Sequence, residues 1–451
     1  MSILQNFQNS QKIDEKTENI DYNCSQNKKG ELETMSVIDT KGVYDIIRKT
    51  LGIINERIMQ HGEITGYILY KMLEYERQYT DQELMDYLML GMLHDIGLYK
   101  EENVKNVADF ETDNLWPHSI YGFLFIKYFS PIGDKAEVIL YHHLDYNKYG
   151  LVQSNYQHIL ECLSLADRME TFLHMREEKK EYNYFNLYRD TKFSGAALDL
   201  FWKAEEKYGI TAKLVDGSFR DEIAQLLNKH NTSEQYKRAF LEMLVYTIDF
   251  RSEHTVVHTL ATMNFAKQIG RLMRLGSKDL SNLYYGALLH DLGKIAIPLN
   301  ILESTGRLSD EEMKVMKAHV RITEMILEGI VDEEVLQIAA RHHEKLDGTG
   351  YHKGLSEKDM TLPQQIIAVA DILSALYGKR SYKEAFSKEK ILDIMQSDAD
   401  NNKINAEAVQ KLAGNYDSII RSFEKEKDDT IGLYLQIKEQ FEVLIEKFKD
   451  L

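Results

Sequence analysis

The 451-residue sequence contains only four prolines, two tryptophans and two cysteines. Scarce proline, together with abundant leucine, isoleucine, lysine, glutamate and methionine, favours long helices over a strand-rich sandwich. Cys24 and Cys162 lie far apart and form no Cys-x-x-Cys pair. This excludes a disulfide framework or a zinc finger and fits a reducing compartment. We therefore expect an all-α protein of the cytoplasm.

The sequence also lacks a long apolar run. No stretch reaches the roughly 18 to 20 apolar residues that a membrane span needs, and the first residues lack the basic-then-apolar order of a signal peptide. The formal net charge of −17 argues against a broad surface for DNA, an RNA polymer or an anionic membrane, since these depend on accumulated lysine and arginine. A small anionic ligand would need local positive charge, which bound divalent cations supply most simply.

Length and pattern predict two helical domains, because one hydrophobic core does not normally serve a chain this long. Residues 1–36 are polar without apolar periodicity and are predicted to form a disordered tail. A polar stretch near residue 232 is placed as the boundary between a first unit, 37–232, and a second unit, 233–451. Amphipathic helices are expected at 40–60, 62–76, 82–96, 255–275, 279–292, 309–328, 332–342 and 362–377.

An internal repeat with a period near 200 residues runs through the histidines and aspartates of the two units. The pairs are His61 and His258, His94-Asp95 and His290-Asp291, His118 and His319, His142-His143 and His342-His343, and Asp167 and Asp371. Their offsets stay between 196 and 204 residues. Loops absorb small changes in length after a duplication, so this drift is expected.

Imidazoles and carboxylates without thiolates are typical ligands of iron, manganese or zinc, and they disfavour a structural zinc cage. The seven candidates of the second unit exceed what one tetrahedral ion takes, so we expect at least two ions. The Asp291 carboxylate could bridge two ions while its neighbour His290 ligates one of them. Paired ions lower the pKa of a bound water and neutralise phosphate, which suits in-line displacement at a phosphodiester.

From Phe250 to Lys383 the residues resemble the HD-GYP phosphodiesterases, a branch of the HD superfamily of helical metal-dependent phosphohydrolases. The matching segments are HDLGKIAIP, a single histidine at 319, HHEKLDGTGYHKGL and VADILSALYGKRSYK. The Gly-Tyr-Pro of the family reads Gly350-Tyr351-His352 here. The resemblance implies two tandem HD-type helical bundles, the first one divergent. It also implies hydrolysis of a cyclic dinucleotide, most often cyclic di-GMP, to linear pGpG or to GMP.

The resemblance assigns the metal ligands one by one. The imidazole ligands would be His258, His290, His319, His342 and His343, with Asp291 as the bridging carboxylate and Asp371 as the closing one. Members with three metals carry a glutamate one helical turn before the first histidine, and His254 stands at that position. Two or three divalent ions, iron or manganese, are therefore expected in the second unit.

The same resemblance assigns the substrate contacts. Lys294 corresponds to the phosphate-contacting lysine of the family and, with Asp291, makes the expected catalytic pair. Arg380 and Lys383 resemble a second phosphate-binding pair, in which an arginine fork and a lysine charge suit phosphate oxygens. The Gly350-Tyr351 loop would shape the pocket for the base or ribose.

The first unit keeps all seven ligand types but differs around them. Leu98 stands where the second unit has its lysine, and the loop HHLDYNKYGLV lacks the Asp-Gly-Thr-Gly run. Arg57 occupies the position of the possible third-metal ligand, where a cation opposes metal binding, whereas Arg176 and Lys179 keep the spacing of the second phosphate pair. The unit could be a regulatory or dimerising module that binds metal or nucleotide without turnover, a second active phosphodiesterase, or a structural remnant.

The leading prediction is a metal-dependent cyclic di-GMP phosphodiesterase that works through its second unit. One alternative is a phosphodiesterase of cyclic GMP-AMP or of another nucleotide, and another is a sensor that binds a nucleotide without hydrolysis. Residues after Ile420 have apolar side chains at helical spacing. They are expected to form a C-terminal packing or dimerisation helix, which would allow a homodimer.

Overall fold

The computed structural model describes residues 37–100, 116–152, 154–174, 183–249, 255–304, 306–378 and 386–448. These residues form α-helices and short 3₁₀ helices, and their only β pairing is two isolated bridges. The all-α prediction is confirmed. The predicted tail at 1–36 lies outside the described residues, as do the candidates His254, Arg380, Lys383, Arg176 and Lys179.

The first unit contains most of its helices before residue 175. They are α2 (Thr40–Ile54), α3 (Glu56–Glu76), α4 (Asp81–Met92), η1 (Ile96–Lys100), α6 (Trp116–Phe129), η2 (Gly133–Lys135), α7 (Glu137–Tyr141), η3 (Tyr146–Leu151), α8 (Gln157–His174), α9 (Tyr184–Leu187), α10 (Gly195–Tyr208), α11 (Ile210–Asp216) and α12 (Phe219–Lys229). The expected helix break near residue 61 is wrong. Asn55 ends α2, and its side chain accepts hydrogen bonds from the backbone N–H groups of Arg57 and Ile58, so it caps α3 and leaves His61 inside that helix.

The second unit repeats this order of elements. It contains α13 (Glu234–Asp249), α14 (Thr255–Leu272), α15 (Ser277–Leu289), η5 (Leu292–Ala296), α16 (Leu299–Leu302), α17 (Asp310–Leu327), α18 (Glu333–Ala340), η6 (Glu357–Asp359), α19 (Leu362–Tyr377), α20 (Lys388–Asp400) and α21 (Ala406–Phe448). Helix α14 packs on α15 and α19 as α3 packs on α4 and α8, and α17 packs on η5 as α6 packs on η1. The repeat seen in the sequence is therefore also a repeat of packing.

One close approach is the same in both units. A Cβ atom added at Gly97 would lie 2.0 Å from the carbonyl oxygen of His118, and one added at Gly293 would lie 2.0 Å from the carbonyl oxygen of His319. No side chain fits at either position, because the backbone of η1 or η5 lies directly on α6 or α17. These glycines hold the His-Asp pair close to the next histidine.

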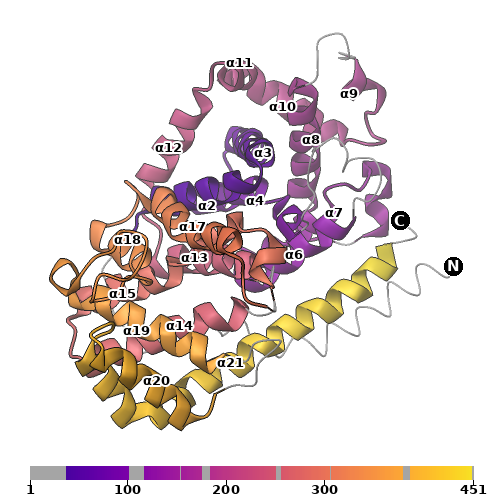
Figure 1. Ribbon diagram of the computed structural model, residues 1–451. Helices are drawn as coiled ribbons and strands as arrows, with labels where there is room; N and C mark the ends of the chain where they lie inside the picture. The colour runs from indigo at the N-terminus through magenta and orange to yellow at the C-terminus, as the bar shows by residue number, and fades with distance from the viewer. Residues whose placement is uncertain are drawn as a thin grey trace.

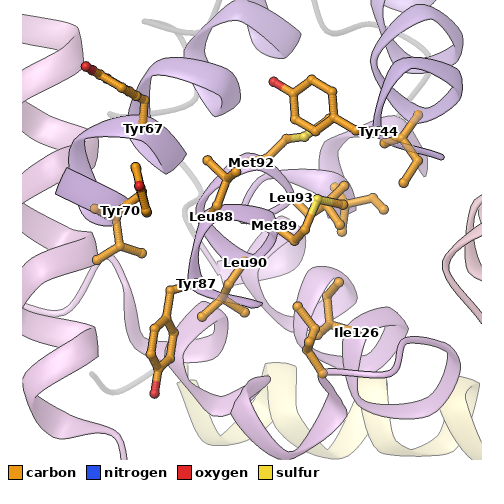
Figure 2. Close-up of a cluster of buried hydrophobic side chains, with 14 of the residues drawn as sticks. Tyr44, Tyr67, Tyr70, Tyr87, Leu88, Met89, Leu90, Met92, Leu93 and Ile126 are labelled. Atoms are coloured by element: carbon orange, nitrogen blue, oxygen red, sulfur yellow. The ribbon is translucent and has the colours of Figure 1, made fainter. Parts of the chain in front are cut away.

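The hydrophobic core runs across the predicted boundary at residue 232. Figure 2 shows part of it, where apolar and tyrosine side chains of α2, α3, α4 and α6 face one another. The same cluster continues through α13 to Leu288 and Leu289 of α15. Helix α13 is tied to the first unit by polar contacts as well, because Lys237 Nζ donates to the carbonyl oxygen of Ile38 at 2.8 Å. The division into two domains stays a prediction.

Helix α21 joins the two units. Its first half packs on α14 and α19, and its last turns lie on α6, as the long yellow helix of Figure 1 shows. There Phe441 stacks on Tyr121 with 3.9 Å between ring centroids, and Trp116 meets Phe448 at 4.6 Å. The expected C-terminal helix therefore packs within its own chain. Among the described residues, no helix combines the length and apolar character that crossing a bilayer requires.

Candidate metal centre

Five helix ends and helix faces of the second unit bring the seven predicted ligands together. His290 and Asp291 follow the end of α15, His342 and His343 follow α18, and single residues come from α14, α17 and α19: His258, His319 and Asp371. The side chains of His290, His319 and His342 are almost fully buried, whereas those of His258 and His343 remain 17% and 28% exposed. The cluster is therefore open to solvent on the side of these two histidines.

Asp291 lies between two groups of histidines and turns one oxygen toward each. Its Oδ2 is 3.0 Å from His290 Nε2 and 3.4 Å from His258 Nε2. Its Oδ1 is 3.5 Å from His319 Nε2 and 3.9 Å from His342 Nε2. This is the arrangement that a carboxylate bridging two ions requires.

Asp371, on α19, also turns its two oxygens toward different histidines. Its Oδ1 is 3.1 Å from His258 Nε2, and its Oδ2 is 3.4 Å from His343 Nδ1. Ligand atoms at 2.0–2.1 Å from a tetrahedral ion lie about 3.3 Å from one another. The separations across this cluster are close to that spacing.

Backbone carbonyls set the orientation of the buried imidazoles. His290, His319 and His342 each place Nδ1 within 2.6–2.7 Å of the carbonyl oxygen three residues earlier. A carbonyl only accepts, so Nδ1 carries the ring hydrogen and the Nε2 lone pair faces the centre. For His258 the corresponding acceptor is the Ser374 hydroxyl, 2.9 Å from Nδ1.

Two buried atoms at the centre, His290 Nε2 and Asp291 Oδ1, have no hydrogen-bond partner. Leaving such atoms unpaired costs free energy, and a divalent ion would satisfy both. The donor set, its spacing and these two atoms fit a divalent metal site.

Burial and the neighbouring charges shift the pKa values of the ligands in opposite directions. Burial lowers the pKa of His319 to about 4, despite the nearby Asp291 charge. Burial alone would also lower the pKa of His258, but hydrogen bonds to Asp291 and Asp371 outweigh it and raise that pKa to about 9. Burial opposes ionisation of Asp371, yet His258 and the neighbouring histidines hold its pKa well below the usual range. The carboxylates are therefore ionised at neutral pH.

Lys294 also points into the cluster. Its Nζ donates to Asp291 Oδ2 at 2.5 Å. Burial disfavours its charge, but Asp291 more than compensates and raises the pKa of the ammonium. The lysine thus places a positive charge beside the Asp291 carboxylate.

The predicted substrate loop lies beside the exposed histidine. The Tyr351 ring packs on His343 with 4.8 Å between centroids, and Lys317 Nζ lies 4.7 Å above the same ring. Gly350 passes so close to the preceding turn that a Cβ atom would lie 2.4 Å from Lys345 N. The buried carboxylate of Glu344 accepts hydrogen bonds from the backbone N–H groups of residues 353 and 355 and holds the loop in place.

Sequence reasoning missed several side chains of this centre. Thr323 Oγ1 accepts from Gly293 N at 2.9 Å and donates to His290 O at 3.0 Å, which clamps the His-Asp turn onto α17. Burial, with the Asp291 charge, raises the pKa of Asp249 to about 7. No motif marks these two residues. The repeat gives no signal for Ser374 either, because the residue 204 positions earlier is Glu170.

The first unit assembles its seven counterparts in the same way. They are His61, His94, Asp95, His118, His142, His143 and Asp167, and their ligand atoms fall into two groups that could each hold an ion. Asp95 again turns Oδ2 toward His61 and His94 at 3.7 and 3.5 Å, and Oδ1 toward His118 and His142 at 3.5 and 3.7 Å.

Comparison with known proteins gives matches for the second unit and for most of the chain. The HD domain family matches residues 224–407. The 3'3'-cGAMP-specific phosphodiesterase 1 of Vibrio cholerae serotype O1 is 21% identical over 400 residues, which covers 84% of this chain and 92% of that protein. The cyclic di-GMP phosphodiesterase response regulator RpfG of Xanthomonas campestris is 36% identical over 171 residues, or 37% of this chain and 45% of that protein.

A solved structure shares the fold over both units. The crystal structure of a cyclic GMP-AMP specific phosphodiesterase of Vibrio cholerae superposes with a TM-score of 0.50 at 20% identity and covers 83% of this chain and 97% of that one. The chain therefore contains an HD domain, the helical fold of a class of metal-dependent phosphohydrolases. The relatives named above are phosphodiesterases of cyclic dinucleotides, and the ligand motifs of this chain resemble those of the HD-GYP family.

Proposed function

We propose that this protein is a metal-dependent phosphodiesterase of cyclic dinucleotides and that the second unit performs the reaction. The observation that carries the proposal is the position of Asp291, whose two oxygens face two separate histidine groups. Divalent ions held there would neutralise the phosphate and lower the pKa of a water.

The protein residues position the phosphate and keep the centre in shape. The Lys294 ammonium lies beside Asp291 and would contact a phosphate oxygen bound at the centre. The Tyr351 ring forms a wall next to His343, and an aromatic face suits stacking with a base. Because His258 and His343 form the exposed side, a dinucleotide would approach from there.

The preferred substrate in this proposal is cyclic di-GMP, with pGpG or GMP as the product. A second candidate, 3'3'-cyclic GMP-AMP, is favoured by one specific observation: the relative that matches along most of the chain is named as specific for it. Two or three ions, iron or manganese, remain our expectation for the second unit. A cytoplasmic location and a homodimer also stay predictions.

The test uses purified full-length protein loaded with Mn²⁺ or Fe²⁺ and a panel of cyclic dinucleotides, with products separated by chromatography. We expect linear product from cyclic di-GMP or from cyclic GMP-AMP, and the ratio of kcat/KM decides between them. Asp291→Asn should reduce turnover by about 10²–10³-fold, the scale of losing an essential electrostatic contact.

Asp95→Asn is the matched control, because Asp95 has the same position and contacts in the first unit. We expect it to retain most of the turnover. Loss of turnover in Asp95→Asn alone would assign the reaction to the first unit. Saturable nucleotide binding with no linear product from any substrate would instead make the protein a sensor.

A further inference from the structure

The first unit brings four side chains with metal-binding groups together from three helices. His61 comes from α3, His94 and Asp95 follow α4, and Asp167 lies on α8. His61 Nε2 is 3.2 Å from His94 Nε2 and 3.1 Å from Asp167 Oδ1, and His94 Nε2 is 3.8 Å from the same oxygen. Asp95 Oδ2 lies 3.7 and 3.5 Å from the Nε2 atoms of His61 and His94. These five distances, 3.1–3.8 Å, lie near the spacing of about 3.3 Å between the ligands of a tetrahedral ion.

Both histidines of this site are held with Nε2 toward the ion position. His94 donates from Nδ1 to the carbonyl oxygen of Gly91 at 2.7 Å. His61 Nδ1 lies 2.6 Å from the fully buried carboxylate of Glu170. Arg57 donates a hydrogen bond to each oxygen of that carboxylate, at 2.7 and 3.0 Å. A carboxylate behind a histidine fixes its tautomer and strengthens it as a ligand.

The second ion position of the first unit is occupied by a chain of hydrogen bonds. Arg168 donates to His143 Nδ1 at 2.9 Å. A guanidinium has only donors, so Nδ1 accepts and the ring hydrogen of neutral His143 lies on Nε2. That nitrogen is 2.9 Å from His118 Nε2 and donates to it. Both ring nitrogens of His143 and the Nε2 atom of His118 therefore take part in hydrogen bonds, which compete with metal binding. In the second unit the residue at the position of Arg168 is Ile372, which offers no such donor.

The site is also closed to a substrate. The side chain of His61 is 1% exposed and that of His143 is 6% exposed, against 17% and 28% for their counterparts in the second unit. Leu98, buried in the core, stands where the second unit carries Lys294. Three buried atoms of this unit that lack a hydrogen-bond partner, Asp95 Oδ1, Asp167 Oδ2 and His142 Nε2, lie on the side of His118 and His143 and are not atoms of the four-ligand site.

We propose that the first unit binds one divalent ion through His61, His94, Asp95 and Asp167, and that this ion ties α3, α4 and α8 together without turning over a substrate. Four protein ligands leave no open position for a substrate or a reactive water, and imidazole and carboxylate donors accept Zn²⁺ as well as iron or manganese. The proposal does not depend on which nucleotide the second unit hydrolyses.

The experiment measures the metal content per chain by inductively coupled plasma mass spectrometry, after saturation with Zn²⁺ and removal of loosely bound ions. The full-length double variant Asp291→Asn/Asp371→Asn disables the second unit, so the ion that remains reports on the first. We expect about one ion per chain and a melting temperature that falls when a chelator removes it and recovers when Zn²⁺ is returned.

Adding Asp167→Asn to that background should abolish the remaining ion and the response to chelator. Adding Arg168→Leu instead should raise the content to about two ions, because His118 and His143 are released to join Asp95 and His142. A double variant that holds no ion and melts at the same temperature with and without chelator overturns the proposal. A double variant that already holds two ions, or no gain with Arg168→Leu, overturns the single-ion site.

Discussion

Replacement of Gly293 by alanine tests how the second centre is held in shape. The new Cβ would lie 2.0 Å from His319 O and 2.8 Å from Thr323 N, both backbone atoms. Real Cβ atoms stay beyond 3.0 Å, so η5 and α17 must separate by about 1 Å. That movement would break the bond from Gly293 N to Thr323 Oγ1, which is 2.9 Å long.

Overpacking of about 1–3 kcal/mol and one lost hydrogen bond of about 1 kcal/mol together predict a loss of about 2–4 kcal/mol in the free energy of unfolding. The effect on the reaction should be larger. Asp291 lies two residues before the glycine, and its distances to the histidines span only 3.0–3.9 Å. A displacement of about 1 Å at a catalytic centre lowers the rate by about 10²-fold.

The assay combines urea denaturation with turnover at saturating metal. Gly276→Ala is the control, since no atom lies within 4 Å of a Cβ at that position. Gly97→Ala repeats the clash in the first unit, 2.0 Å from His118 O, and should lower stability while the folded fraction keeps most of its turnover. An unfolding midpoint and a turnover for Gly293→Ala that both match those of the Gly276→Ala control would refute the reasoning.

Three further predictions concern neighbouring features. Thr323→Val removes two buried hydrogen bonds and should cost about 1–3 kcal/mol in urea denaturation, whereas a shift under a few tenths of a kcal/mol would contradict the clamp. Burial raises the pKa of Asp249 to about 7. The neutral carboxyl therefore supports folding below about pH 4, and this contribution is lost as the pH rises through 7. In chelator, Asp249→Asn should gain stability over wild type between pH 5 and 8, by at most about 4 kcal/mol, and a pH-independent difference would be evidence against burial of the charge. Phe441→Ala removes the stack on Tyr121 and should cost about 1–3 kcal/mol and speed hydrogen exchange in α6, which unchanged exchange would contradict.

Much of the second centre could be predicted because its ligands occur in a fixed order with constant offsets. His290-Asp291 and His342-His343 are adjacent in the sequence, so any helix end that exposes one residue of a pair brings the other near it. The family prediction is confirmed by the comparisons. The break between α2 and α3 was misplaced because the cap at Asn55 depends on two backbone hydrogen bonds that apolar periodicity does not reveal.

The difference between the two centres could not be predicted from the ligands, which are the same in type and order. It arises from Arg168, Glu170 and Arg57, whose effect depends on the atoms they reach across α3, α7 and α8. A charged residue in a helix is by default solvated, and only packing makes it a partner of a buried imidazole.

Residue types and spacing alone thus determined an all-α chain with two sets of metal-binding residues, because helical periodicity and ligand chemistry are local properties. Tertiary structure alone decided which set is open, which nitrogen of each histidine faces the centre and which cations lie beside the carboxylates. These depend on contacts of about 3 Å, and hydrogen bonds operate only at that range. Some of the contacts join neighbouring residues, as between His290 and Ala287, and others join segments more than a hundred residues apart, as between His61 and Glu170.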